Sequence, residues 1–162
     1  MLASSRWLRT CALAITSLLI PATFLATAGS ADAAERARER KIDRAVQVAR
    51  NQIGDPYRYG AAGPGAFDCS GLMMFAYNKV GISLPRTTDA QAGHVRRIHR
   101  QNMHRGDLMF FYSSGGVYHV GMFVGWDNGR RVILHASTSG RPVQKDRVWS
   151  NSWYPGTLRL RH

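Results

Sequence analysis

The sequence predicts an α+β fold, in which helices come first and a small antiparallel β-sheet follows. Apolar residues recur at helical spacing in the first half of the chain, and in the second half they alternate with a period of two. The chain has 162 residues, of which 44% are hydrophobic and 20% charged, as in a globular protein. We therefore expect a single folded domain with its helices packed on the sheet.

The first thirty-three residues resemble a secretory signal peptide. Arg6 and Arg9 precede an apolar run without charge, and the small residues "ADA" at 31–33 form a cleavage site. Pro21 interrupts the run and argues against a spanning helix, although an uncleaved anchor is the alternative. We expect a signal peptide over 1–33, a charged lead over 34–41 and a folded domain over 42–162. The protein would then be secreted or wall-associated, without stable membrane insertion.

The folded domain should open with an amphipathic helix that stops at Gly54, where Asp55-Pro56 follows. A glycine-rich loop leads to a second helix, which starts near Asp68 as N-cap and runs to about Lys79. Thr88 and Gln91 predict a capping box for a third, short helix. The apolar face of the first helix consists of Ile42, Ala45, Val46, Ala49 and Ile53.

Four later segments have the composition and alternation of strands. Short turns, "SSGG" and "DNG", separate the first three, which makes those neighbours antiparallel. The predicted strands are "DLMFFY" (107–112), "YHVGMFVG" (118–125), "RVILHAS" (131–137) and "TLRLRH" (157–162).

Cys69 is the most informative residue of the predicted domain. Cys11 leaves with the signal peptide, so Cys69 is the one remaining thiol and can form neither an internal disulfide nor a cysteine zinc site. It falls in the first turn of the second helix, where unpaired N–H groups favour thiolate over thiol. This placement suits a nucleophile, and an inert buried cysteine is the alternative.

A cysteine nucleophile needs a base and an orienting partner. His119 and His135 each lie in an apolar strand, whereas the other histidines lie in a basic connection or at the terminus. In a hairpin with a three-residue loop, Asp127 to Gly129, paired residue numbers have an even sum and the two histidines share one face, roughly 7–8 Å apart. A two-residue Asn128-Gly129 turn would place them on opposite faces. The functional interpretation thus requires a particular turn.

The order of several short motifs resembles the NlpC/P60 cysteine peptidases. The matching runs are "GDPYRYG", "FDCSGLMMFAY", "LPRTTDAQ", "RGDLMFF", "HVGMFVG" and "ILHAS", between about residues 42 and 140. Tyr59 stands where the family often has tryptophan.

The resemblance implies a papain-like catalytic domain that cleaves peptidoglycan stem peptides, usually between the γ-carboxyl of D-glutamate and a diamino acid. It implies Cys69 as nucleophile, His119 as base and His135 as orienter, without metal or cofactor. Tyr57 would help to hold the oxyanion. Asp68 and Ser70 would bind the substrate's amino end.

The strongly basic composition, with a formal net charge of +12, bears on partners. Export and the lack of a nucleic-acid-binding motif argue against nucleic acid, and outside the cell the polyanions are wall polymers and lipid headgroups. Anionic wall polymer held by Arg96, Arg97, Arg100 and Arg105 is one interpretation, and charge for solubility alone is the other. Tryptophans 126, 149 and 153 have two interpretations, sugar stacking and the commoner anchoring of loops.

Two other functions remain open from the sequence. The same residues would serve an N-acetylmuramoyl-L-alanine amidase or an acyl transferase, and a non-catalytic wall-binding module is a further alternative. The complete set of Cys69, His119 and His135 argues against the latter. We expect a monomer.

Overall fold

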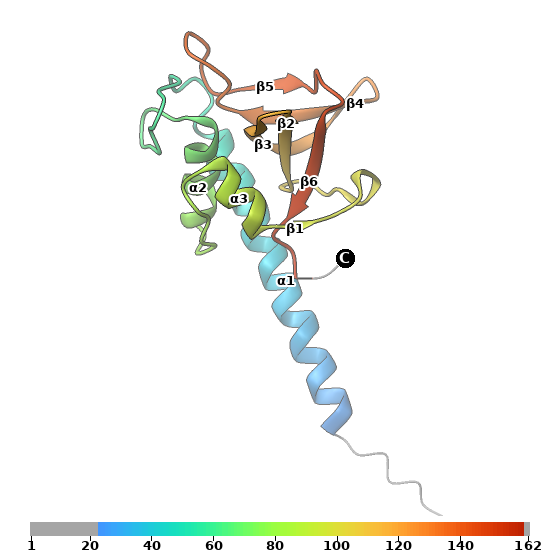
Figure 1. Cartoon of the computed structure of the whole chain (residues 1–162). Coiled ribbons are helices and arrows are strands. Elements are labelled where there is room, and N and C mark those ends of the chain that lie inside the picture. The colour runs from blue at the N-terminus through green and yellow to red at the C-terminus, as the bar shows by residue number, and fades with distance from the viewer. Residues whose placement is uncertain (1–22, 161–162) are drawn as a thin grey trace, which may run out of the picture.

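The computed structural model describes residues 23–160, and three helices lie on one side of a β-sheet (Figure 1). The helices are α1 (Thr23–Arg50), α2 (Cys69–Asn78) and α3 (Thr88–His94), with a short 3₁₀ helix η1 (Arg100–Asn102). The strands are β1 (Arg96–Arg97), β2 (Leu108–Ser113), β3 (Gly116–Asp127), β4 (Arg130–His135), β5 (Gln144–Arg147) and β6 (Trp153–Thr157). The predicted α+β class is confirmed.

The six strands form one antiparallel sheet in the order β1-β6-β2-β3-β4-β5. Strands β2 to β5 are a meander, as expected from their short turns, while β6 returns to the other side of β2 and carries β1 on its outer edge. The predicted sheet lacked β1 and β5, because a two-residue strand and the polar segment "QKDR" have no apolar alternation.

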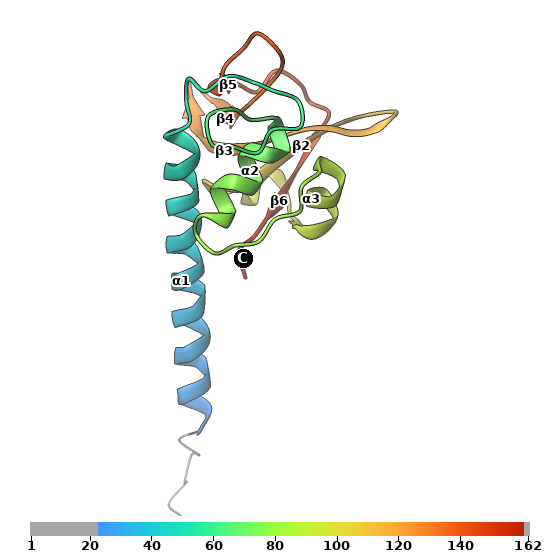
Figure 2. The same ribbon diagram turned by 90° about the vertical axis from the view of Figure 1, so that its left-hand side faces the viewer.

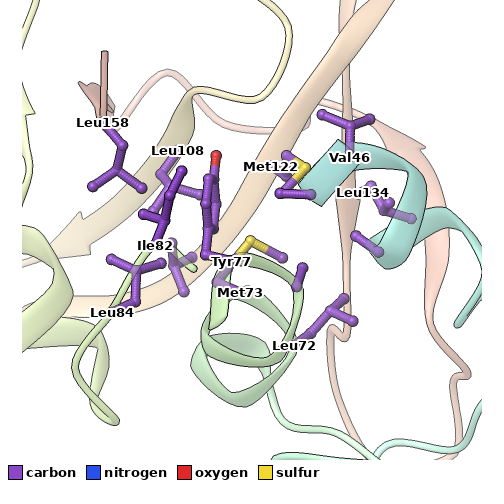
Figure 3. Close-up of a cluster of buried hydrophobic side chains, with 14 of the residues drawn as sticks. Val46, Leu72, Met73, Tyr77, Ile82, Leu84, Leu108, Met122, Leu134 and Leu158 are labelled. Atoms are coloured by element: carbon purple, nitrogen blue, oxygen red, sulfur yellow. The ribbon is translucent and has the colours of Figure 1, made fainter. Parts of the chain in front are cut away.

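The main core lies between the helices and the facing side of the sheet (Figure 3). Val46 of α1 and Leu72 and Met73 of α2 meet Met122 and Leu134 of the sheet, and all five are fully buried. A second, smaller cluster consists of Met109, Phe111, Phe123, Ile133 and Trp153, which belong to strands only. Both sides of the central strands are therefore covered.

Helix α1 begins well before the predicted start near residue 42, and the charged lead over 34–41 is part of it. Arg38 donates to the carbonyl of Leu158 at 2.8 Å, and Glu39 pairs with Arg159 at 2.7 Å, so this segment docks on the C-terminal strand region. The N-terminal part of α1 extends away from the domain in both views (Figures 1 and 2).

The predicted signal peptide lies mostly in residues 1–22, outside the described residues, and it stays a prediction. Within residues 23–160, no helix has both the length and the apolar character needed to cross a membrane.

Two element boundaries differ from the predictions. Thr87, not Thr88, caps α3 by accepting from the N–H of Ala90, and Gln91 is fully buried instead of closing a capping box. The last strand covers Trp153–Thr157, so it ends at the residue where the predicted strand began, and Arg159 beyond it turns inward to pair with Asp107 at 2.6 Å. The apolar alternation of "TLRLRH" thus predicted the last strand too late in the sequence.

The β3–β4 hairpin has the tight two-residue turn, so the expected three-residue loop is wrong. Asp127 pairs with Arg130, and positive φ angles of 46° at Asn128 and 75° at Gly129 are typical of a type I′ turn. A β-bulge between Phe123 and Gly125 then inserts one extra residue and restores the even sum of paired numbers. The bulge therefore places His119 and His135 on one face of the sheet, which the longer loop was expected to do.

Candidate active site

Helix α2 presents Cys69 at its first turn, as predicted. Asp68 is the N-cap and its Oδ1 accepts from the N–H of Gly71 at 2.7 Å, while its Oδ2 accepts from the N–H of Gly60 at 2.9 Å. One carboxylate thereby fixes both the helix start and the glycine-rich loop in front of it. The Cys69 side chain is half-buried and forms no disulfide.

Arg86 also stabilises the start of helix α2. Arg86 binds both oxygens of Asp68, with its Nη2 at 2.5 Å and its Nη1 at 3.0 Å, and also donates to Ser70 Oγ at 3.0 Å. Burial alone would raise the pKa of Asp68, but the hydrogen bonds from Arg86 and Gly71 outweigh it and hold that pKa below its usual value. Asp68 is therefore a fixed negative charge beside the thiol.

Position 71, directly after Cys69 and Ser70, has no room for a side chain and therefore requires glycine. A Cβ built at this position would lie 2.1 Å from the backbone oxygen of Ala61 and 2.9 Å from Cα of Ala62. The absence of a side chain lets the loop over residues 55–67 pack directly on the helix start, where it forms one wall of the site.

Cys69 opens into a cavity of about 500 Å³. Its Sγ lies 3.6 Å from Oγ1 of Thr88, which belongs to the first turn of α3. Val117 and Tyr118, the two residues directly before His119 on β3, also line the cavity. The remaining lining residues are Tyr57, Tyr59, Gly60, Asp68, Ser70, Arg86, Thr87, Thr88 and Asp89.

His119 and His135 share one face and are in direct contact. The Nε2 atom of His119 lies 2.8 Å from Nδ1 of His135, and both side chains are buried, with exposed fractions of 6% and 1%. Because of the bulge, His119 lies diagonally across from His135, and Gly121 is directly opposite His135 in the register. A Cβ at Gly121 would come within 2.9 Å of His135 Cβ, so glycine leaves the room that the imidazole pair occupies.

Asp146 is a third member of this row, and no sequence pattern predicted it. Its Oδ2 lies 3.0 Å from Nε2 of His135 and also accepts from Gln144 at 2.7 Å and Arg141 at 3.1 Å. Burial would raise the pKa of Asp146, but the hydrogen bonds from His135 and Gln144 outweigh it and keep the pKa low. Asp146 is thus ionised, and its carboxylate can accept hydrogen bonds but cannot donate them.

The order of contacts fixes which ring nitrogens carry protons. Since Asp146 accepts, His135 must donate through Nε2, and its neutral ring then accepts at Nδ1. His119 therefore donates through Nε2, and its Nδ1 keeps an unshared electron pair. Burial and the neighbouring His135 lower the pKa of His119 to about 3, so the ring is neutral at neutral pH. His119 is in the form that a general base requires.

The predicted site residues fall into two groups. Cys69, Tyr57, Asp68 and Ser70 line one cavity, whereas His119 and His135 are not among its lining residues and form a separate buried pair. Burial, followed by the nearby Cys69, raises the pKa of Tyr57, so its hydroxyl is a hydrogen-bond donor. Within residues 23–160, no three His, Cys, Asp or Glu side chains are placed to hold a metal ion.

Sequence reasoning missed Arg86, Thr88 and Asp146. The run "LPRTTDAQ" contains the first two, but it suggested no role for Arg86 and only a helix cap for Thr88. Asp146 follows His135 by eleven residues in a polar segment, and only the pairing of β4 with β5 brings it close.

Comparisons with known proteins identify the family of the chain. The sequence model of the NlpC/P60 family matches residues 54–162. The chain belongs to the NlpC/P60 family. It is 43% identical over 100 residues to the probable endopeptidase Cgl2188 of Corynebacterium glutamicum, which covers 62% of this chain and 45% of that protein. It is 39% identical over 108 residues to the probable endopeptidase p60 of Listeria monocytogenes, covering 67% of this chain and 21% of that protein.

Solved NlpC/P60 structures show the same papain-like α+β fold. The P60 domain of the Mycobacterium avium subspecies paratuberculosis antigen MAP1204 superimposes with a TM-score of 0.65 at 30% identity, covering 76% of this chain and 98% of that domain. The peptidoglycan hydrolase RipB of Mycobacterium tuberculosis gives a TM-score of 0.66 at 27% identity, covering 76% of this chain and 67% of that one. The chain spans less than half the length of the curated relatives named above.

Proposed function

We propose that this NlpC/P60 protein is an exported cysteine endopeptidase that hydrolyses peptidoglycan stem peptides. The observation that carries the proposal is the row Asp146–His135–His119, which leaves Nδ1 of His119 with an unshared electron pair, while Val117 and Tyr118 directly before it line the cavity that contains Cys69. Relatives named as probable endopeptidases and structural neighbours named as peptidoglycan hydrolases support the substrate class. The expected bond joins the γ-carboxyl of D-glutamate to a diamino acid, as the family resemblance implies.

In the proposed mechanism, Nδ1 of His119 takes the proton of the Cys69 thiol as the sulfur attacks the amide carbon. The thiolate and the carboxylate of Asp146, acting through His135, offset the positive charge that forms on His119. The backbone N–H of Cys69 and the hydroxyl of Tyr57 stabilise the oxyanion. The C–N bond then breaks, His119 protonates the leaving amine, and water hydrolyses the thioester to release the acid and the free thiol.

Asp146 acts in this scheme as a positioning residue, because it touches His135 and neither the substrate nor the sulfur. It sets the tautomer of both rings, much as carboxylates orient imidazoles in other sites. Arg86 holds Asp68 and Ser70 together at the start of α2, and the substrate's amino end binds to Asp68 and Ser70 in this proposal.

The test is digestion of purified tripeptide and tetrapeptide stems, with products identified by mass. Cleavage after the γ-carboxyl of D-glutamate, abolished in the Cys69→Ser variant, is the expected result. Release of the whole stem from N-acetylmuramic acid in muropeptides would show the amidase alternative, and peptide joined to an added amine would show acyl transfer. Binding to walls without any cleavage would overturn the proposal in favour of a non-catalytic module.

Export is the remaining part of the proposal. The predicted signal peptide over 1–33 supports secretion or association with the wall. N-terminal sequencing of the protein recovered from culture medium would test it, and a start after Ala33 is the expected outcome.

A further inference from the structure

Away from the Cys69 cavity, arginines stack on aromatic rings of strand β6, which lies next to the edge strand β1. The guanidinium of Arg97 lies 4.1 Å from the ring centre of Tyr154, and that of Arg100 lies 4.1 Å from the ring centre of Trp153. Because successive strand residues point to opposite faces, these two stacks occupy the two sides of β6. Arg131, from β4, lies 4.5 Å from the ring centre of Trp126 and 5.4 Å from that of Trp153.

These side chains line two cavities that share several residues, and together we name them the arginine groove. One cavity of about 810 Å³ is bordered by Arg97, Arg100, Arg131, Trp153 and Tyr154. A second, of about 260 Å³, shares Arg100, Arg131 and Trp153 with it and extends past Trp126 and Arg130 to Trp149. The lining of both cavities contains no aspartate or glutamate.

The positive charge of the groove has no internal counterion. Among residues 23–160, Arg97, Arg100, Arg130 and Arg131 form no ion pair, whereas Arg105 pairs with Asp43 and Arg147 with Asp127. Arg131 donates to the carbonyl of Arg100 at 2.9 Å, which places two like charges side by side, and its buried Nε has no hydrogen-bond partner. Burial and the charge of Arg100 lower the pKa of Arg131, which marks an electrostatic cost that an anion would relieve.

The aromatic rings restrict the kind of anion. Trp126 is 59% exposed beside Arg131, and Trp149 is 49% exposed although it stacks on Phe111, so the exposed part of each ring is available to a ring-shaped ligand. Guanidinium groups bind phosphate oxygens in a planar, two-point manner. We propose that the arginine groove binds a phosphodiester-linked glycan of the cell wall, whose phosphates contact Arg97, Arg100 and Arg131 and whose sugar rings lie on the exposed tryptophans. This surface is distinct from the peptide cavity and would hold the enzyme on its substrate.

This inference revises the earlier expectation that Arg96, Arg97, Arg100 and Arg105 act together. Arg97 and Arg100 belong to the groove, and Arg131, distant in the sequence, joins them. Arg105 has its own carboxylate partner, and Arg96 is absent from the lining of either cavity.

The experiment is sedimentation with purified Gram-positive walls that carry a phosphodiester glycan, and with the same walls after hydrofluoric acid has removed it. The Arg97→Gln/Arg100→Gln/Arg131→Gln variant should bind intact walls at least tenfold more weakly at physiological ionic strength. The matched control Arg40→Gln/Arg44→Gln/Arg105→Gln loses the same charge from exposed positions elsewhere and should bind nearly as well as the parent. Both variants should hydrolyse a soluble stem peptide at the parent rate, which separates this test from that of the proposed function.

Because Arg100 and Arg131 also donate to backbone carbonyls, Arg97→Gln alone is a second variant. Arg97 is exposed, and its replacement should weaken wall binding several-fold without changing the unfolding transition. Equal loss in the groove and control triples, or equal binding to intact and stripped walls, would overturn the proposal. Stronger binding of single-stranded DNA than of the intact walls would overturn it as well, in favour of a nucleic-acid surface.

Discussion

Acidification should destabilise this fold because His119 resists protonation when it is buried. In the unfolded chain a histidine takes up a proton below about pH 6.5, whereas burial and His135 lower the pKa of His119 to about 3 in the folded protein. Between these values the unfolded state binds more protons, so the free energy of unfolding falls as the pH falls. The stabilisation is fully present above about pH 6.5 and is lost progressively down to about pH 3.

The size of the effect follows from the difference in pKa. At pH 4.5 the unfolded histidine is about two pH units below its pKa and the folded one is still neutral, so the loss relative to pH 7 is about 2.5 kcal/mol at 1.36 kcal/mol per unit. Other groups titrate over the same range, and a variant that lacks only this titration isolates the contribution. His119→Gln is suitable because its amide N–H can still donate to Nδ1 of His135.

The assay is urea unfolding of the parent and of His119→Gln at pH 7 and pH 4.5, followed by circular dichroism. The parent should lose about 2.5 kcal/mol more than the variant between the two pH values. An equal loss in both proteins would show that His119 titrates normally, and the reasoning about its tautomer and burial would then be wrong.

Three further substitutions test other parts of the site. Cys69→Ser should keep the fold, since it is nearly isosteric, and lower stem-peptide hydrolysis by about 10³ or more, measured as kcat in clean protein; substantial residual turnover would contradict the nucleophile assignment. Asp146→Asn should lower kcat by about 10- to 100-fold with little change in KM, because an amide no longer dictates which nitrogen of His135 is protonated; an unchanged kcat would remove Asp146 from the scheme. Gly71→Ala should lower the free energy of unfolding by about 2 kcal/mol or more, because the new methyl group meets the backbone oxygen of Ala61; full stability in urea would mean that the loop moves aside at little cost.

The sequence was most informative where structure is decided locally. The start of α2 follows from Asp68 as an N-cap and from the glycine-rich loop before it, and both signals lie within a few residues of Cys69. The face shared by His119 and His135 was also predicted, but the turn that was expected to produce it is absent. A bulge leaves little trace in composition, because its extra residue is an ordinary member of an apolar run.

The remaining parts depend on long-range pairing. Asp146 reaches His135 only after β5 has paired with β4, and "QKDR" has no pattern that predicts a strand. Strand β6 contains Pro155 and Gly156, which argue against a strand in a single sequence. It is tolerated because β1 pairs only with Gly156 and Thr157, so the edge beside Pro155 needs no ladder N–H.

The bulge between Phe123 and Gly125 separates the tip of the β3–β4 hairpin from the histidines at its base. Beyond the bulge, the tip could be lengthened by a pair of residues, one on each strand, without rotating either imidazole. A single residue inserted into one strand would need a second bulge or a longer turn to keep His119 on the same face as His135. The hairpin tip is therefore a natural place to graft a short peptide or a reporter group in even steps while the active site stays in register.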